Sequence, residues 1–142
     1  MPLLSCKTIL VIGAVVDIAL HSGKGKMVSA LDLADRLQLP PRHLELVLHE
    51  LVRKGILLGL RGPRGGYRLA KARQAISVYD ISEAVKAVET EKPNEAGLVG
   101  TVVIPALMQA EQCFVSALER ISVEDLVQAA RLQMLASNRP EA

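Results

Sequence analysis

The pattern of apolar and polar positions along the chain favours helices at its beginning. Ser5 can accept a hydrogen bond as the cap of a helix over Cys6–His21, whose residues are mostly apolar. A basic, glycine-containing loop follows at Ser22–Lys26. Ser29 can cap a second, short helix over Ala30–Leu37.

A third helix is predicted directly after a four-residue turn, Gln38–Pro41. It covers Pro41–Lys54, because proline suits the first helical position and Gly55 suits the position after a helix end. Its apolar stripe follows the i, i+3, i+4, i+7 spacing of one helix face: Leu44, Val47, Leu48 and Leu51. Two short helices joined by a tight turn predict a helix-turn-helix.

Two short apolar runs, Ile56–Leu60 and Tyr67–Ala70, come next and are separated by a turn rich in glycine and arginine. This pattern predicts a β-hairpin. A hairpin after a helix-turn-helix would be the wing of a winged helix. Glycine in the turn would let backbone approach backbone, and Arg61 and Arg64 would suit a DNA minor groove or its phosphates.

The rest of the chain is predicted to be helical, over Val78–Glu89, Val102–Ile121 and Val123–Ala136, with a polar loop at Glu89–Gly100. The long helix carries an a/d-type seam that predicts dimerisation: Leu107, Ala110, Phe114, Ala117 and Ile121. The alternative is that this seam packs on its own domain.

The predicted fold class is mainly α with a small β-hairpin. We predict a winged helix-turn-helix DNA-binding domain over residues 1–76 and a helical effector and dimerisation region over 77–136. Residues 137–142 are expected to be a disordered tail.

The net charge changes sign at the same boundary, between residues 76 and 77. Residues 1–76 hold 12 Lys/Arg and 5 Asp/Glu, a balance of +7, while residues 77–142 hold 5 and 10, a balance of −5. A basic front half suits a polyanion such as DNA, although a segregated solvated surface would give the same count. Aromatic residues make up 2% of the chain, which argues against a site built on base stacking.

Cys6 and Cys113 are too far apart in sequence for a disulfide framework or a metal-binding pair, and they favour a reducing cytoplasm. The run Ile9–Val16 is interrupted by Asp17, so no signal peptide or membrane span is expected from it. His43 and His49 lie six residues apart, which is not the spacing of a helical metal pair.

The glycine-rich stretch "LRGPRGGYRL" has alternative interpretations. A nucleotide-binding loop would need GxxxxGK followed by Ser or Thr between a strand and a helix, and this stretch lacks that ending. A purely structural hairpin remains open. No acid–base pair, metal spacing or nucleophile motif indicates an enzyme.

Longer stretches of the chain resemble the Rrf-type winged-helix regulators, the bacterial group that contains IscR, NsrR and CymR. They are "LLSCK", "LADRLQLPPRHLELVLHELVRKGIL", "LRGPRGGYRLAKARQAISVYDISEAVKAVE" and "ISVEDLV". The resemblance covers nearly the whole chain and is most specific in the wing.

The resemblance implies a homodimer that contacts double-stranded DNA through the helix-turn-helix and the wing. Together with the pattern above, it gives these candidate DNA-binding residues: Lys7, Ser29, Pro40, Arg42, His43, Glu45, His49, Arg53, Arg61, Gly62, Pro63, Arg64, Gly65, Gly66 and Tyr67. Pro40 and Arg42 stand where cluster-binding relatives usually carry serines, and Arg64 stands where the wing tip usually has glycine.

Cluster-binding members of this group also carry three closely spaced cysteines between the two back-half helices, whereas residues 89–105 here contain none. A usual [2Fe–2S] cluster, which needs thiolate ligands, is therefore not expected, and neither is another metal or cofactor. The effector stays unknown.

The sequence thus predicts a cytoplasmic, homodimeric DNA-binding transcriptional regulator, a repressor on a palindromic operator. The alternative from another class is a winged-helix module that contacts proteins and does not bind DNA.

Overall fold

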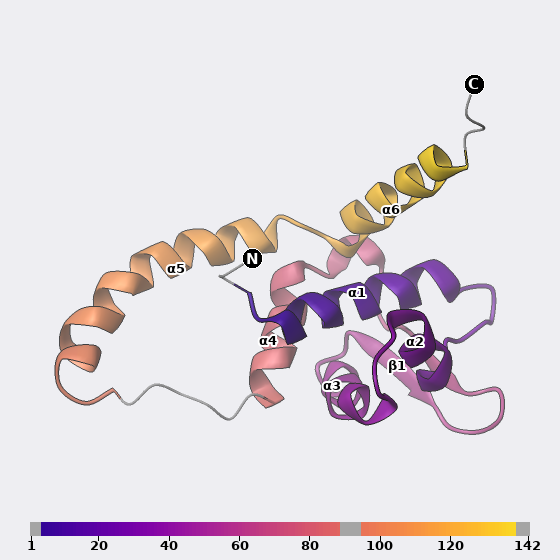
Figure 1. Cartoon of the computed structure of the whole chain (residues 1–142), viewed down its shortest axis with the longest axis horizontal. Helices are drawn as coiled ribbons and strands as arrows, with labels where there is room; N and C mark the ends of the chain where they lie inside the picture. Colours follow the sequence, from indigo (N-terminus) through magenta and orange to yellow (C-terminus); the bar gives the residue numbers. More distant parts are fainter. Residues whose placement is uncertain (1–3, 89–94, 139–142) are drawn as a thin grey trace.

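The structure is a computed structural model that describes residues 4–88 and 95–138. Its elements follow one another along the chain as α1 (Cys6–His21), α2 (Ala30–Leu37), α3 (Pro41–Arg53), β1 (Leu57–Leu60), β2 (Gly66–Leu69), η1 (Arg73–Ala75), α4 (Val78–Val88), η2 (Val99–Val103), α5 (Ile104–Glu119) and α6 (Val123–Ser137). In Figure 1, α2, α3 and the hairpin gather below α1, while α5 and α6 extend away from them. The predicted fold class, mainly α with a small hairpin, is confirmed.

Side-chain caps explain why the first two helices begin where the sequence predicts. The hydroxyl oxygen of Ser5 accepts a hydrogen bond from the backbone N–H of Thr8, at 3.1 Å. The hydroxyl of Ser29 accepts one from the N–H of Asp32, also at 3.1 Å. Each bond satisfies an amide that the helix itself leaves without a partner.

The third helix ends at Arg53, one residue before the predicted end. Lys54 already has a ψ of −3°, and Gly55 follows with a φ of +78°, in the left-handed region that favours glycine. This turn redirects the chain into β1.

The two strands pair antiparallel, with Leu57 opposite Leu69 and Leu60 opposite Gly66. β2 therefore begins one residue earlier than predicted, because Gly66 belongs to the ladder and not to the turn. Val28 extends the hairpin on its other side. Its N–H donates to the carbonyl of Tyr67 at 2.9 Å, and its carbonyl accepts from the N–H of Tyr67 at 2.7 Å.

A single hydrophobic core joins the predicted front and back regions. The largest fully buried side chains come from α1, α2, α3 and β1 at the front, from α4 and α6 at the back, and from Ile76 after η1: Val15, Ile18, Leu33, Val47, Leu48, Leu51, Leu57, Ile76, Ile81, Val85, Val123 and Val127. α4 packs against both α1 and α3, and α6 packs against α1. The helix-turn-helix therefore packs against the back half of the chain through shared aliphatic side chains.

Backbone pairing separates α5 from α6 and corrects the predicted end of the long helix. The N–H of Val78 donates to the carbonyl of Ile121, and the N–H of Val123 donates to that of Ile76, both at 2.8 Å. Ile121 is therefore extended beside residues 76–78 and lies outside the helix, which ends at Glu119. Ser122 then caps α6 in a reciprocal arrangement with Asp125.

The start of the long helix also differs from the prediction. A π-helical turn at Val99–Val103 runs directly into α5, so helical structure begins three residues before Val102. The hydroxyl of Thr101 donates to the carbonyl of Gly97 at 2.8 Å and supports this turn.

Residues 89–94 of the predicted loop lie outside the described part of the chain, as do Glu89 of the predicted fourth helix and residues 139–142 of the predicted tail. The last helix reaches Ser137, one residue beyond its predicted end, so the predicted tail was wrong at this residue; Asn138 is the C-terminal cap of α6.

The helical stretch Val99–Glu119 is long and apolar enough, by length and composition alone, to cross a membrane. The sequence pattern alone did not predict a membrane-spanning helix at these residues. A single helix of this kind is weak evidence for membrane insertion. Only 6% of the residues in its most apolar 18-residue stretch are buried within the chain. Most of the apolar surface of this helix is therefore exposed in the single chain.

Candidate nucleic-acid interface

The third helix of the fold turns one face to the core and the other to solvent. Its predicted apolar stripe is buried, with Leu44, Val47, Leu48 and Leu51 at most 3% exposed. The candidate readers Arg42, His43, Glu45 and His49 are all exposed on the other side. Pro40 is the exposed N-cap residue, and Pro41 occupies the first turn. The helix therefore presents a largely polar face that starts at its N-terminus and is interrupted by exposed Leu46.

The tip of the wing, residues 61–65, is a tight turn closed by a hydrogen bond of 2.9 Å from the N–H of Gly65 to the carbonyl of Gly62. Arg61, Pro63 and Arg64 are exposed on it. Gly62 has a φ of +115°, which side-chain-bearing residues rarely adopt. The turn thus places two arginines at the outermost point of the hairpin.

Glycine at the base of the tip is required by close backbone approach, as the sequence predicted. A Cβ at Gly65 would collide with the carbonyl of Leu60. A Cβ at Gly66 would collide with the carbonyl of Val28, on the segment that enters α2. Gly66 therefore lets the wing lie tightly against the segment that leads into α2, which holds the wing next to the helix-turn-helix.

A hollow of about 400 Å³ lies between α3 and the hairpin. Its wall contains four candidate residues with polar or cationic groups, His49, Arg53, Arg61 and Tyr67, together with Gly66. Burial, and secondarily the negative charge of Glu45, raises the pKa of the Tyr67 hydroxyl. The phenol therefore stays protonated and can donate a hydrogen bond to an anionic oxygen.

Val52, Gly59 and Leu60 complete the wall of this hollow, and the sequence analysis did not name them as site residues. Gly59 faces Tyr67 in the strand register. A Cβ at Gly59 would lie 3.4 Å from the Tyr67 ring, so the small residue leaves space for the ring. The only sequence signal for this role was the single glycine within a four-residue apolar run.

Arg53 is held by a carboxylate of its own helix. Its Nε lies 3.1 Å from both carboxylate oxygens of Glu50, and one terminal nitrogen donates to Oε1 at 2.7 Å. These hydrogen bonds lower the pKa of Glu50 and raise that of Arg53. Arg53 thus reaches the hollow as a paired cation, unlike Arg42, Arg61 and Arg64, for which no carboxylate partner is found within the described residues.

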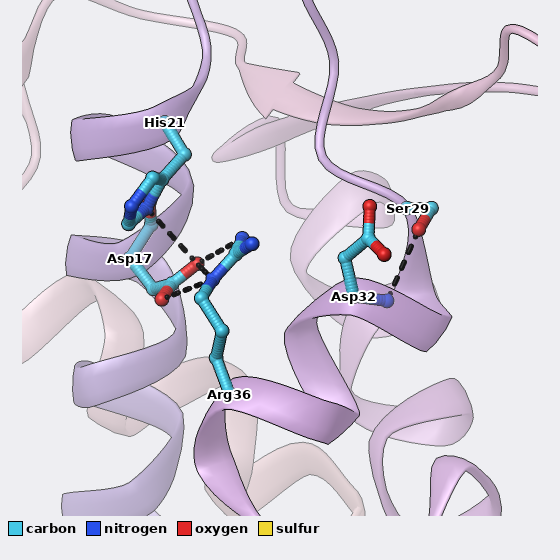
Figure 2. A network of polar contacts seen from close by, with 5 residues as sticks. All are labelled: Asp17, His21, Ser29, Asp32 and Arg36. Atoms are coloured by element: carbon cyan, nitrogen blue, oxygen red, sulfur yellow. Dashed lines mark hydrogen bonds and ion pairs between the residues drawn. The ribbon is translucent and has the colours of Figure 1, made fainter.

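An ion pair joins α1 and α2. Figure 2 shows Arg36 of α2 pointing at Asp17 of α1. Nε of Arg36 donates to both carboxylate oxygens at 2.9 and 3.1 Å, and a terminal nitrogen donates to Oδ1 at 2.7 Å. His21 lies beside the pair, with Nδ1 3.5 Å from the same Oδ1.

The cap bond of Ser29 is visible at the N-terminus of α2 in Figure 2, so this candidate residue has a structural role as well.

Lys7 lies in the first turn of α1 and is exposed, at the opposite end of that helix from Asp17 and His21. It does not line the hollow between α3 and the wing. The structure therefore groups the α3 and wing candidates and leaves Lys7 apart from them.

The comparisons with known proteins agree with this architecture. Residues 4–129 match the model of a family described as Rrf2, iron-dependent transcriptional regulator. The chain belongs to the Rrf2 family. The resemblance inferred from the wing and the helix-turn-helix is thereby confirmed.

Two relatives illustrate how far the similarity to other Rrf2 members extends. The chain is 36% identical over 90 residues to the regulator IscR of Cereibacter sphaeroides, across 63% of this chain and 58% of that protein. It is 35% identical over 124 residues to a Synechocystis protein named as an HTH-type transcriptional regulator, across 83% of this chain and 82% of the relative. The chain thus spans less than two thirds of the first of these proteins.

Solved structures of Rrf2 proteins share the fold. The IscR structure from T. potens superposes with a TM-score of 0.71 at 24% identity, covering 98% of this chain and 93% of that one. The structure of CymR, the global cysteine regulator of B. subtilis, gives a TM-score of 0.66 at 21% identity, covering 89% and 96%. The winged-helix fold is therefore confirmed over almost the entire chain.

The family's description as iron-dependent can be tested against the cysteines of this Rrf2 chain. Cys6 is in the first turn of α1, Cys113 is in α5, and both are exposed. Within residues 4–88 and 95–138, no three His, Cys, Asp or Glu side chains come together as a metal site. The two cysteines of one chain do not fit the usual cysteine ligation of a [2Fe–2S] cluster.

Four of the five predicted dimerisation residues lie on α5: Leu107, Ala110, Phe114 and Ala117. Leu107, Ala110 and Phe114 line a hollow of about 500 Å³ between the start of α1, α4 and α5. Leu107 and Ala110 are exposed, and Phe114 is half-buried. Ala117 is exposed, and Ile121 lies beyond the end of α5. Other exposed apolar side chains of this stretch include Val102, Val103 and Met108, so the apolar surface is wider than the predicted seam.

Proposed function

We propose that this Rrf2 protein is a cytoplasmic bacterial transcriptional regulator that binds double-stranded DNA through α3 and the wing. The observation that carries the proposal is the hollow between α3 and the wing, which His49 of α3 and Arg61 of the wing line together. Arg42 and His43 are exposed on the same helix, outside this hollow. A helix in the major groove and a basic hairpin beside it leave a gap through which one phosphate backbone passes.

The residues divide by the part of the duplex they would contact. Arg42, His43, Glu45 and His49 would contact base edges in the major groove, where arginine suits guanine and glutamate accepts from cytosine. Arg61 and Arg64 would enter the minor groove or contact its phosphates. Tyr67 and Arg53, on the wall of the hollow, would donate to a backbone phosphate between the two grooves.

We further propose that the protein acts as a homodimer on a palindromic operator. The support is the helix α5, most of whose apolar side chains are exposed in the single chain, together with exposed Leu132 and Leu135 on α6. A second copy with twofold symmetry would cover this surface and present two identical DNA-binding faces. A dimer on such a site would exclude other proteins from that DNA, which is the action of a repressor.

The proposed regulator works without a usual [2Fe–2S] cluster. The chain has only two cysteines, one on α1 and one on α5, and the site residues named above require no metal for their contacts with DNA. Its regulation would then depend on an effector other than a cluster held by three cysteines of one chain.

The experiment that tests this proposal uses protein purified without oxygen. Its iron content and visible absorption are recorded, and the same sample is used to select binding sites from a random DNA pool. A colourless protein that enriches a palindrome is the expected result. A brown, iron-containing protein would refute the cluster-free part alone. A sample that enriches no sequence would refute DNA binding and favour the protein-interaction module.

A further inference from the structure

Leu46 is an aliphatic residue in the middle of the polar face of α3. Its side chain is 68% exposed, whereas the apolar stripe of the same helix is at most 3% exposed. The fold therefore does not use this leucine for packing within the chain. A large apolar side chain exposed in isolation is common on protein surfaces, so its significance depends on what surrounds it.

The neighbours of Leu46 are the candidate base-reading residues. Residues three and four positions apart adjoin on a helix surface, which puts Arg42 and His43 one turn before Leu46 and His49 one turn after it. All three neighbours are exposed. An apolar protein surface pressed onto Leu46 would have to desolvate these polar groups, which is unfavourable unless each finds a partner.

The major groove offers both kinds of contact within one surface. Its floor carries hydrogen-bond donors and acceptors for arginine, histidine and glutamate, and its apolar feature is the C5-methyl group of thymine. A helix that places Leu46 between polar readers matches a groove in which a thymine lies between polar base edges. The chemistry of the face therefore favours DNA over an apolar protein partner.

We infer that Leu46 is a specificity-determining residue that packs on the C5-methyl group of one thymine in each half-site of the operator. This inference rests on the proposed DNA-binding function and adds a contact with one specific base, a thymine, to it. It also explains how α3 can select a T·A pair although no Asn or Gln, the usual partners of adenine, occurs in its sequence.

The test replaces thymines of the selected operator by deoxyuridine, which lacks only the methyl group, at symmetric pairs of positions. Removing one buried methyl group from each half-site should weaken binding about fourfold per half-site, or about 15-fold for the pair, from about 0.8 kcal/mol per buried methylene-sized group. Equilibrium titration of labelled duplexes with wild-type protein and with Leu46→Ala gives the four affinities of a double-mutant cycle.

We expect one thymine pair whose replacement weakens wild-type binding by this factor and has no effect on Leu46→Ala. Leu31→Ala is the matched control, because Leu31 of α2 is 71% exposed but lies outside α3. It should retain the wild-type response to deoxyuridine. Both leucines are exposed, so neither variant should disturb the core.

The remaining outcomes distinguish a failure of this inference from a failure of the proposed DNA-binding function. An operator without any thymine pair that couples to Leu46 would overturn this inference and leave DNA binding intact. Loss of the same coupling in Leu31→Ala would assign the contact to α2 and would equally overturn it. Failure to enrich any operator would overturn the proposed function and this inference with it.

Discussion

At the scale of single residues, the wing depends on positions where a side chain cannot be accommodated. Gly66 combines a φ of +146° with a backbone carbonyl, that of Val28, in the place of its missing Cβ. Gly62 also has a positive φ, but it has open space around it. Conformation and contact therefore both restrict Gly66, and its role is to hold the wing against the helix-turn-helix.

Replacing Gly66 by alanine should destabilise the fold by about 1–3 kcal/mol, because the new methyl group meets backbone that cannot move aside and the φ is strained. Urea denaturation followed by circular dichroism measures this change. Gly13→Ala is the matched control: Gly13 lies within α1 with open space around it, so alanine should be neutral or stabilising by up to about 1 kcal/mol. Equal stability of the Gly66 variant and wild type would contradict the described packing of the wing.

Arg61→Ala should weaken binding to all DNA sequences by a similar factor, because a phosphate or minor-groove contact carries little sequence information. The slope of log affinity against log salt concentration should decrease by about 1 per lost phosphate contact in each chain. Fluorescence anisotropy across a salt series measures both quantities. Arg131→Ala, an exposed arginine on α6, should change neither. An unchanged slope for Arg61→Ala would remove the wing from the interface.

At the scale of elements, one ion pair connects the helix-turn-helix to α1. Asp17 and Arg36 are 19 residues apart and connect α1 to α2 through three hydrogen bonds. The Asp17 side chain is only 13% exposed, and its hydrogen bonds raise the pKa of Arg36. The Asp17–Arg36 pair is therefore more shielded from water than the Lys86–Glu83 pair.

Arg36→Gln should lower the free energy of unfolding by about 1 kcal/mol, because a bidentate and partly shielded pair is stronger than an exposed one. Lys86→Gln is the control, since the Lys86–Glu83 pair spans 3.3 Å and both side chains are exposed. Its loss should cost about 0.3 kcal/mol or less. Thermal and urea unfolding measure both variants, and equal effects would contradict the stabilising role of Asp17–Arg36.

Local signals predicted the elements well and their contacts less well. The starts of α1, α2 and α3 followed from Ser5, Ser29 and the proline turn, since capping is decided within four residues. The pairing of Val28 with Tyr67 could not be predicted, because it joins segments nearly 40 residues apart through backbone atoms that carry no sequence signature. The early end of α5 has the same cause, since Ile121 pairs with a distant segment.

The candidate site shows the same difference: its local features were predictable, and its contacts between side chains were not. The exposed face of α3 was predictable from helical periodicity, and the arginines of the wing tip from composition. The Glu50–Arg53 pair and the hollow shared by α3 and the wing depend on side-chain placement, which the sequence pattern does not specify. Helical spacing places Leu46 off the apolar stripe of α3, but its importance depends on its exposure among polar neighbours, which the structure shows.

At the scale of the whole molecule, α5 carries many apolar side chains that a single chain leaves exposed. The helix extends away from the winged helix-turn-helix (Figure 1), and Leu118 is its only side chain described as buried. The proposed dimer would cover this surface.

Leu107→Asp should therefore dissociate the dimer, because Leu107 is 60% exposed in the single chain and a carboxylate at an apolar interface is strongly unfavourable. Light scattering coupled to size-exclusion chromatography measures the mass. Gln109→Asp adds the same charge at an exposed polar position of the same helix and should leave the dimer intact. A Leu107→Asp variant of dimeric mass would place the interface elsewhere.

The central claim is that two copies present α3 and the wing to one duplex. A hydroxyl-radical footprint of the protein on its selected operator tests it most directly. The account predicts two symmetric sets of protected sugars whose centres lie about one helical turn (~10 bp) or a multiple of it apart, with protection extending into the flanking minor grooves under the wings. A single unsymmetric footprint, or no protection at concentrations that saturate binding, would contradict it.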